Sequence, residues 1–428
     1  MILGGLADDL TGGLELAAML VAEGVPTVLT TSAGAAEAVT GVEAIVIAQK
    51  TRIAPAQEAV ERFGEGAAVL QAKGARQLFF KYCATFDSTD EGNIGPCMDV
   101  LSDRTGAAFT ACCPTFPEYA RTVFQGHLFA GDRLISESPK RHDPVTPMHD
   151  PDLVRVLQRQ TKRRVGLLGQ DHVRRGPQAI AARVAALREA GVPYAIADAA
   201  THEDLAALAE VCVDWPLMTG GSSIAAHYPR FWRQRGWLGE AAAKASLPAV
   251  SAPGVVLAGS CAQETRRQLE RFGERHPVLT LDLRRHAGGA DQVGSAVEWA
   301  LSRLAAGPVA LATSADPDTV ARLQAAFGVA GAAAMAEDLL GRISRRLREA
   351  GVRRFVVAGG ETSGAILQHL GISRLQVGPF AGPSLPLALD VDSGGDPLLV
   401  CLKSGKLAGI DAFEEALQAM SRSSGAAA

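Results

Sequence analysis

The segment GLADDLTGG, residues 5–13, decides the fold class because it joins an apolar run to a helical pattern through a short polar turn. The run from Met1 to Leu6 is typical of a buried strand. Apolar residues then recur at helical spacing, at Leu14, Leu16, Ala17, Leu20 and Val21. A buried strand that turns directly into an amphipathic helix is the repeating unit of α/β proteins.

Two adjacent carboxylates, Asp8 and Asp9, stand at the point where this strand becomes a helix. One of them, or Thr11, is enough to cap the free N–H groups of the helix, and the glycines ease the turn. The second aspartate adds like-charge repulsion and needs a reason of its own. The pair therefore marks residues 8–9 as a candidate functional site.

The composition is that of a globular protein, with 428 residues, 47% of them hydrophobic and 21% charged. A net charge of −4 argues against nucleic-acid and membrane-surface partners, which usually require a basic face. No apolar run reaches the roughly 18 residues of a membrane-spanning helix, and we expect no signal peptide. The seven cysteines include no C-x-x-C pair, so we expect reduced thiols, mostly in the core, and a cytoplasmic protein.

Strand-like and helix-like patterns alternate along most of the chain, which predicts two α/β domains, each a largely parallel sheet flanked by helices. We place the domains at 1–240 and 250–428, because an Ala-, Pro- and Ser-rich stretch at 236–253 interrupts the alternation. Strands are expected at 1–6, 26–30, 44–48, 77–82, 107–112, 165–168, 193–197, 254–259, 278–283, 308–313, 354–358, 385–391 and 398–402. Helices are expected between most of them, for example at 55–73, 175–190, 262–275, 290–305 and 332–350.

The pattern breaks between Pro114 and Lys162, in a proline-rich stretch with little periodicity. A connection of this length is usually functional or disordered. Its aromatic and apolar residues favour an ordered excursion, which we expect to cover the active site or to form a subunit contact.

In the second half, RFVVAGGETSGAILQHLGI (residues 354–372) predicts a strand, a glycine turn and a helix that begins near Thr362. Backbone N–H groups at such a turn form an anion site that the helix dipole strengthens. A plain strand–helix turn capped by Thr362 is the structural alternative. Glu361 beside such a turn makes sense mainly if it holds a metal ion or its water shell.

Two further loops resemble this turn. Gly259 and Ser260 follow one apolar strand, and Lys403, Ser404 and Gly405 follow another. Three loops of this kind at strand ends favour a nucleotide-phosphate site. The Walker pattern G-x-x-x-x-G-K-[ST] is absent, and no G-x-G-x-x-G follows a strand, which disfavours a dinucleotide site.

In the first half, a polar turn follows the strand that ends near Lys81, in the sequence FFKYCATFDSTDEGNIGP. Arg52 and Lys81 supply cations for a carboxylate, while the Asp and Asn side chains suit vicinal hydroxyls. The expected site is completed by Asp8, Asp9, Asp87, Ser88, Thr89 and Asn93. This inventory fits a small polyhydroxy acid, and a surface turn with a salt bridge is the alternative.

The quoted motifs ADDLTGGLE, KYCATFDSTDEGNIGP, GSCAQET, GGETSGA and LKSG occur in the order found in the four-carbon acid sugar kinases, and the chain resembles that family from Leu3 to about Gly409. The middle segment is most similar to the 3-oxo-tetronate 4-kinase branch. Against that branch, Ala84 and Ala262 each stand where a serine is usual, and KSGKLAG replaces KSGNFG.

The resemblance implies an N-terminal domain that binds the acid sugar, a C-terminal domain that binds ATP with Mg²⁺, and an active site in the cleft between them. ATP would contact Ser260, Gly359, Gly360, Glu361, Thr362, Ser363, Lys403 and Gly405. Asp9, or alternatively Asp8, would accept the proton of the terminal hydroxyl, while the other aspartate orients the substrate or binds Mg²⁺. Lys81 or Arg52 would pair with the substrate carboxylate, and Asp87, Ser88, Thr89 and Asn93 would hold the sugar.

The resemblance implies transfer of a phosphoryl group from ATP to the 4-hydroxyl of an acid sugar, with 3-oxo-tetronate as the expected substrate. D-Threonate, L-threonate and D-erythronate are the alternatives within the class. A binding protein without catalysis is the alternative outside it, and a dehydrogenase is disfavoured by the missing dinucleotide turn. A homodimer is the default for an enzyme of this size.

Overall fold

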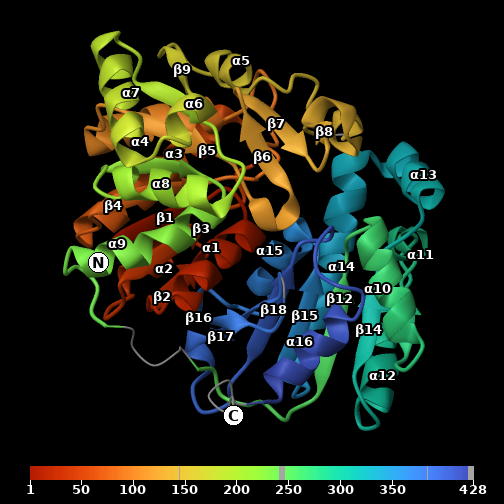
Figure 1. Cartoon of the computed structure of the whole chain (residues 1–428). Coiled ribbons are helices and arrows are strands. Elements are labelled where there is room, and N and C mark those ends of the chain that lie inside the picture. Colours follow the sequence, from red (N-terminus) through yellow and green to blue (C-terminus); the bar gives the residue numbers. More distant parts are fainter. Residues whose placement is uncertain (144, 241–245, 383, 423–428) are drawn as a thin grey trace. The chain divides into compact units, whose positions relative to one another are not determined.

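The computed structural model describes residues 1–143, 145–240, 246–382 and 384–422, and its chain divides into two compact units, Met1–Ala243 and Lys244–Ala428. Part of the expected boundary stretch, residues 241–245, lies outside the described residues. Figure 1 shows both units as α/β structures, which confirms the predicted fold class.

Unit 1 is built on a sheet of eight parallel strands in the order β2-β3-β1-β4-β11-β5-β10-β9. The strands are β1 (Leu3–Ala7), β2 (Thr27–Thr30), β3 (Ala44–Ala48), β4 (Gln77–Lys81), β5 (Thr110–Cys113), β9 (Val165–Leu168), β10 (Tyr194–Ala197) and β11 (Leu217–Gly220). The helices are α1 (Leu10–Ala22), α2 (Ala33–Glu37), α3 (Ala56–Ala72), α4 (Ile94–Thr105), α5 (Leu153–Gln158), α6 (Gln170–Val173), α7 (Pro177–Glu189), α8 (His202–Cys212) and α9 (Tyr228–Gln234).

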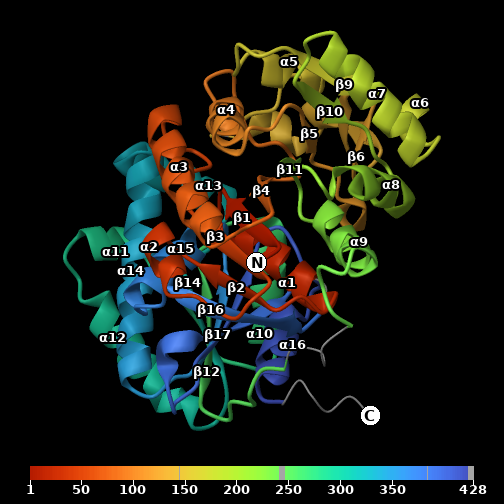
Figure 2. The same cartoon turned by 90° about the vertical axis from the view of Figure 1, so that its left-hand side faces the viewer.

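Helices cover both faces of this sheet, with α3 and α4 packed together on one face and α1 and α8 on the other (Figure 2). Burial on both faces explains why strands such as AIVIA, residues 44–48, are continuous apolar runs. Five of the seven cysteines are buried, as expected for core residues. Most of the predicted acid-sugar residues follow β1 and β4, in the segments that lead into α1 and α4.

The proline-rich excursion is largely ordered. It contains a small antiparallel sheet of β6 (Arg121–Phe124), β7 (His127–Ala130) and β8 (Arg133–Leu134), which the sequence patterns did not predict. Short 3₁₀-helical turns accompany this sheet. They are η1 (Pro117–Tyr119), η2 (Ile135–Glu137) and η3 (Pro139–His142). A last short turn of unit 1, η4 (Ser223–His227), follows β11.

Unit 2 has five parallel strands, β13-β14-β12-β15-β18, extended by β17 and β16, which run antiparallel to their neighbours. The strands are β12 (Gly254–Ala258), β13 (Val278–Thr280), β14 (Val309–Ala312), β15 (Arg354–Ala358), β16 (Arg374–Phe380), β17 (Pro386–Asp390) and β18 (Leu399–Lys403). The helices are α10 (Gln263–Gly273), α11 (Leu283–Ala287), α12 (Gln292–Leu304), α13 (Pro317–Phe327), α14 (Val329–Glu349), α15 (Gly360–His369) and α16 (Ala412–Met420), with the turn η5 (Val391–Ser393).

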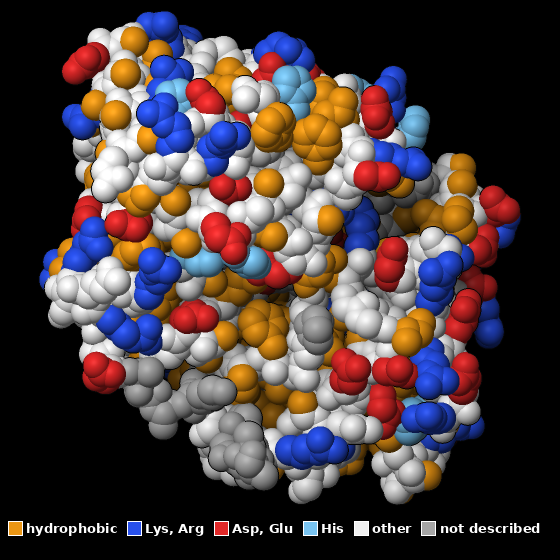
Figure 3. Space-filling view, viewed as in Figure 1, with side chains coloured by type: hydrophobic (Ala, Val, Ile, Leu, Met, Phe, Trp, Pro, Cys, Tyr) orange, Lys and Arg blue, Asp and Glu red, His pale blue; other side chains and the backbone are white. Residues whose placement is uncertain are grey.

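Among the described residues, no single helix has both the length and the apolar character to cross a membrane. The pair α13 and α14 meets those two criteria only jointly and is bent by 105°. Figure 3 shows acidic and basic side chains interspersed on the visible face, without a large area of one sign.

Candidate functional site

Asp8 and Asp9 follow β1, and the structure gives each a different set of partners. Asp9 is the N-cap of α1, where Oδ1 accepts the N–H of Gly12 at 2.9 Å and Oδ2 accepts the Thr11 hydroxyl at 2.7 Å. Asp8 is buried and receives two parallel hydrogen bonds from Arg52, at 2.8 and 2.9 Å. Arg52 also lies 2.9 Å from Asp9 Oδ1, so one guanidinium holds both carboxylates together.

The two carboxylates differ in their electrostatics as well. Burial raises the pKa of Asp8 above its ordinary value, although Arg52 opposes that rise. Burial acts the same way on Asp9, but the charges of Arg52 and Lys81 lower the pKa of Asp9 below its ordinary value. Asp9 therefore remains ionised more readily than Asp8, as the predicted proton acceptor must.

Lys81 ends β4 beside this pair, because Ala7 of β1 and Lys81 are partners in the parallel register. The side chain is buried, and its ammonium donates to the carbonyl of Tyr82 at 2.8 Å. A Cβ added at Gly12 would lie 2.4 Å from Asp9 Oδ1 and 2.9 Å from Lys81 Nζ. Glycine at position 12 is thus what lets the cap and the ammonium approach the same turn.

The Ser88–Asn93 turn is fixed mainly by bonds to its neighbours. Asn93 donates to the carbonyls of Thr51 at 2.7 Å and Ala54 at 3.0 Å, which ties the turn to the segment that carries Arg52. The Ser88 hydroxyl accepts a hydrogen bond from Gln160 at 2.8 Å. The structure thus brings Asn93 to the Arg52 segment by its side chain, while the hydroxyl of Ser88 faces the excursion.

Asp87 is paired with a residue that the sequence patterns did not single out. The ammonium of Lys140, in η3 of the excursion, lies 2.9 Å from Asp87 and 2.8 Å from Asp143. Burial alone would raise the pKa of Asp87, but Arg52 and Lys140 lower it below its ordinary value. The excursion therefore packs on the predicted sugar-binding turn.

A pocket of about 450 Å³ lies where the turn and the excursion meet. Its lining includes Ser88, Thr89, Met148, His149 and Arg159. Two of the predicted sugar-binding residues therefore line a pocket, while the cluster of Asp8, Asp9, Arg52 and Lys81 does not line it.

Two residues near Lys81 were missed by the sequence analysis, Glu15 and Ser222. Glu15 lies on α1, and its Oε2 accepts the Ser222 hydroxyl at 2.9 Å. Ser222 follows β11 in the sequence TGGSS, and Gly220 of that strand pairs in register with Lys81. The strand, glycine pair and hydroxyl residues of TGGSS repeat the pattern of the GGETS turn, which is the signal that could have found this loop.

In unit 2, the predicted nucleotide loops pack directly against one another. A Cβ at Gly259 would lie 2.1 Å from Thr362 Oγ1, and a Cβ at Gly405 would lie 2.0 Å from Ser260 Oγ. Gly359 has φ +129°, a conformation that disfavours side chains. The structure thus brings together the ends of β12, β15 and β18, as the three loops predict.

The predicted nucleotide residues differ in how accessible they are. Ser363 is fully buried, and its hydroxyl donates to the Gly359 carbonyl at 2.7 Å. Lys403 is also fully buried, and its Nζ has no hydrogen-bond partner among the described residues. Burial lowers the pKa of Lys403 to about 8. Gly360 begins α15, and Glu361 is exposed in its first turn.

Within the described part of the chain, no group of three or more His, Cys, Asp or Glu side chains is arranged to hold a metal ion. Magnesium at kinase sites usually binds one or two carboxylates together with the substrate phosphates. The single carboxylate of Glu361 beside the glycine turn fits that donor set.

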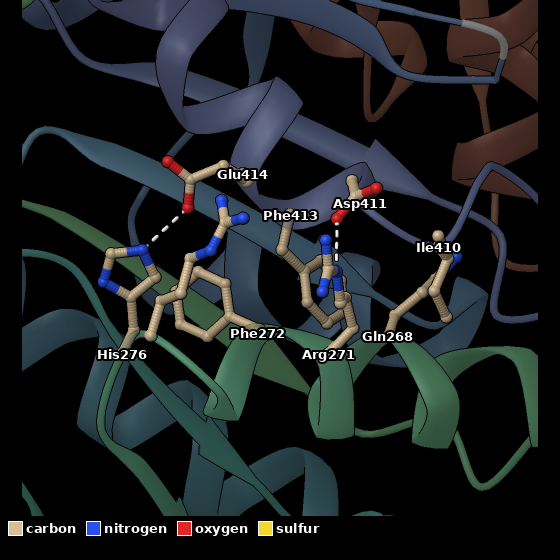
Figure 4. Close-up of a pocket in the computed structure, with 9 residues that line it drawn as sticks. Gln268, Arg271, Phe272, His276, Ile410, Asp411, Phe413 and Glu414 are labelled. Atoms are coloured by element: carbon tan, nitrogen blue, oxygen red, sulfur yellow. Dashed lines mark hydrogen bonds and ion pairs between the residues drawn. The ribbon is translucent and has the colours of Figure 1, made fainter.

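A small pocket between α10 and α16 carries no predicted residue (Figure 4). Its volume is about 10 Å³, which is room for about one water molecule. Its walls are joined by His276–Glu414 at 2.7 Å and Arg271–Asp411 at 2.8 Å. This pocket is therefore a packing feature of unit 2.

Comparisons with known proteins agree with the division into two units. Residues 3–228 match a family model described as a sugar-binding N-terminal domain, and residues 255–413 match one described as a nucleotide-binding C-terminal domain. The chain is 45% identical to a Burkholderia multivorans protein over 98% of its own length and 97% of the relative's, and 45% identical to a Cupriavidus necator protein over 97% and 96%. Both relatives are named 3-oxo-tetronate kinase.

A solved Salmonella typhimurium LT2 structure, provisionally described as a tRNA synthase, has a TM-score of 0.83 at 35% identity and covers 97% of this chain and 98% of its own. This chain belongs to the four-carbon acid sugar kinase family. It is accordingly a phosphotransferase with an alcohol group as acceptor.

Proposed function

We propose that this chain transfers the γ-phosphoryl group of ATP to the terminal 4-hydroxyl of a four-carbon acid sugar, with 3-oxo-tetronate as substrate. The observation that carries the proposal is the 45% identity, over nearly the whole chain, to relatives named 3-oxo-tetronate kinase. The gathering of Asp8, Asp9, Arg52 and Lys81 at adjoining strand ends supports it.

ATP would bind on the loops that follow β12, β15 and β18 in unit 2. Backbone N–H groups around Gly359 and Gly360, at the start of α15, suit the phosphates. Thr362 lies against Gly259 there, Ser260 lies against Gly405, and these residues would border the nucleotide. Magnesium would sit beside Glu361 and supply charge neutralisation to the phosphates.

The acid sugar would bind in unit 1, against the cluster of Asp8, Asp9, Arg52 and Lys81. Lys81 would pair with the substrate carboxylate, because Arg52 already holds Asp8 and Asp9. Asp9 would accept the proton of the terminal hydroxyl, since the neighbouring cations keep it ionised. Positioning and charge stabilisation of this kind are the main demands of phosphoryl transfer.

The test is a measurement of ADP release and product mass with Mg·ATP and, separately, 3-oxo-tetronate, D-threonate, L-threonate and D-erythronate. We expect turnover with 3-oxo-tetronate above the other three. A preference for another acid would change the substrate, and nucleotide binding without turnover on any acid would favour a binding protein.

Asp9→Asn separates the two duties of Asp9, because asparagine caps helices about as well as aspartate but cannot accept the proton. We expect kcat to fall far more than KM rises. Asp132→Asn, at a fully solvated surface carboxylate in the excursion, is the control and should change neither. Equal changes of kcat and KM in Asp9→Asn would contradict the role of a proton acceptor.

A further inference from the structure

Glu15 faces the candidate acid-sugar cluster from α1, less than two helical turns after the N-cap Asp9. Its main charged neighbour is Lys81, and its Oε2 is held by the Ser222 hydroxyl at 2.9 Å. Its Oε1 makes no hydrogen bond with a described residue. One oxygen of this half-buried carboxyl group is thus fixed, and the other is available to a ligand.

The loop after β11, which carries the Glu15 partner Ser222, lies very close to the neighbouring backbone. Ser222 is fully buried and lies 207 residues from Glu15 in the sequence. A Cβ at Gly220 would lie 2.2 Å from the carbonyl oxygen of Cys113, and a Cβ at Gly221 would lie 3.0 Å from that of Pro114. Gly220 leaves no room for a side chain and Gly221 leaves little, so the two glycines let the chain turn tightly before Ser222, which bonds to the Glu15 carboxyl group.

Lys81, whose charge acts on Glu15, has spare hydrogen-bond donors. An ammonium group carries three N–H bonds, and the described residues account for one acceptor, the Tyr82 carbonyl. Since Lys81 is only 3% exposed, its remaining donors need acceptors that a bound ligand would supply.

The charges around Lys81 do not balance. The carboxylates of Asp8, Asp9 and Glu15 face the two cations Arg52 and Lys81, which leaves one negative charge uncompensated. Glu118 and Tyr119 of η1 also face Glu15 and add no positive charge. An acid-sugar anion would bring a further negative charge into this buried cluster, which is costly unless a proton enters with it.

Glu15 is the group of this cluster best placed to take that proton. Asp8 and Asp9 both contact the Arg52 guanidinium, whereas Glu15 has no ion-pair partner within 4.0 Å among the described residues. Burial raises the pKa of Glu15 above its ordinary value, although Lys81 and the Ser222 hydroxyl favour the charged form. A protonated carboxyl group can donate a hydrogen bond to a ligand carboxylate.

We propose that Glu15 is a further ligand-binding residue of this site, and that its protonated carboxyl group donates a hydrogen bond to the acid-sugar carboxylate that Lys81 binds. The proposal rests on the proposed function, because it takes a four-carbon acid sugar as the ligand. Each binding event then draws a proton from solution onto Glu15, and the release of ligand returns it.

The test is calorimetric titration of the full chain with 3-oxo-tetronate, D-threonate, L-threonate and D-erythronate, without ATP, in two buffers of different ionisation enthalpy, between about pH 6 and about pH 8. We expect uptake of up to about one proton per bound ligand, and an affinity that falls by up to about tenfold per pH unit where Glu15 is ionised in the free protein. Glu15→Gln keeps a hydrogen-bond donor without a titrating proton, so it should bind with no proton uptake and with little dependence on pH.

Glu118→Gln is the matched control, because Glu118 faces the same region but pairs with Ser223 and His202. It should retain the proton uptake of the unmodified chain. Proton uptake that persists in Glu15→Gln, or an affinity of the unmodified chain that does not change with pH, would overturn the proposal. Failure of all four acids, 3-oxo-tetronate included, to bind at any pH would instead contradict the proposed function, and this inference with it.

Discussion

Removal of Arg52 should destabilise unit 1 strongly, because Arg52 is the ion-pair partner of buried Asp8 and also contacts Asp9. The Arg52→Ala change leaves two adjacent carboxylates at the end of β1 without their bridging cation. Breaking a buried ion pair from one side costs roughly 3–5 kcal/mol. Because 22% of the Arg52 side chain is exposed, water can partly replace it, and we expect a loss near the lower end, about 3 kcal/mol.

The loss should depend on pH. Without Arg52 the pKa of Asp8, which burial already raises, must rise further, so Asp8 takes up a proton in the folded chain at a higher pH. The penalty is present where Asp8 is ionised and shrinks as the pH falls through its pKa. The destabilisation by Arg52→Ala should therefore be larger at neutral pH than near pH 5.

Urea unfolding of the two chains at both pH values, followed by circular dichroism, measures this loss. Arg62→Ala is the matched control, because Arg62 pairs with Glu58 on the exposed surface of α3 and should contribute at most about 1 kcal/mol. Adding Asp8→Asn to Arg52→Ala should restore part of the lost stability. A loss of unfolding free energy smaller than that of Arg62→Ala, or no rescue by Asp8→Asn, would contradict the role of Arg52 as the partner of the buried Asp8.

Three further predictions test other parts of the structure. Gly220→Ala should lower the free energy of unfolding in urea by about 2 kcal/mol or more, because the added Cβ would lie 2.2 Å from the backbone oxygen of Cys113. The control Gly34→Ala, whose Cβ meets no atom within 4 Å, should leave the free energy of unfolding nearly unchanged. Gly405→Ala should weaken binding of a non-hydrolysable ATP analogue about tenfold, since its Cβ would lie 2.0 Å from Ser260 Oγ, and unchanged affinity would count against a nucleotide site there. Burial lowers the pKa of Lys403 to about 8, so between that pH and 10.5 the unfolded chain binds one more proton than the folded chain, and the stability should rise with pH. Lys403→Met should abolish this rise of the thermal unfolding temperature with pH. An unaltered pH profile in the variant would contradict the prediction.

The strands of both sheets were predictable where they are continuous apolar runs flanked by turns. Residues 44–48 and 354–358 are strands in the structure, as predicted. β11 was missed, although it lies in the middle of the sheet of unit 1, because its four residues include Thr219 and Gly220 and carry no apolar run. The antiparallel β16 and the small sheet of the excursion were missed for a related reason, since their strands are only partly buried and carry no long apolar run.

The candidate site was predictable as an inventory but not as a set of contacts. The positions of Asp8, Asp9, Arg52 and Lys81 at strand ends follow from the strand pattern, since parallel strands end at one edge. That Arg52 would hold both aspartates, and that Lys140 would pair with Asp87, depends on side-chain packing between distant segments. Glu15 was missed because its partner Ser222 follows the strand that the pattern did not indicate.

The proposed function rests on transfer of the phosphoryl group of ATP to the terminal hydroxyl of a four-carbon acid sugar. The most direct measurement is ³¹P nuclear magnetic resonance of the product formed from Mg·ATP and 3-oxo-tetronate. We expect a new phosphate ester whose phosphorus couples to the two protons of the terminal carbon, formed in proportion to ADP. ADP with inorganic phosphate alone, or an ester on another oxygen, would contradict it.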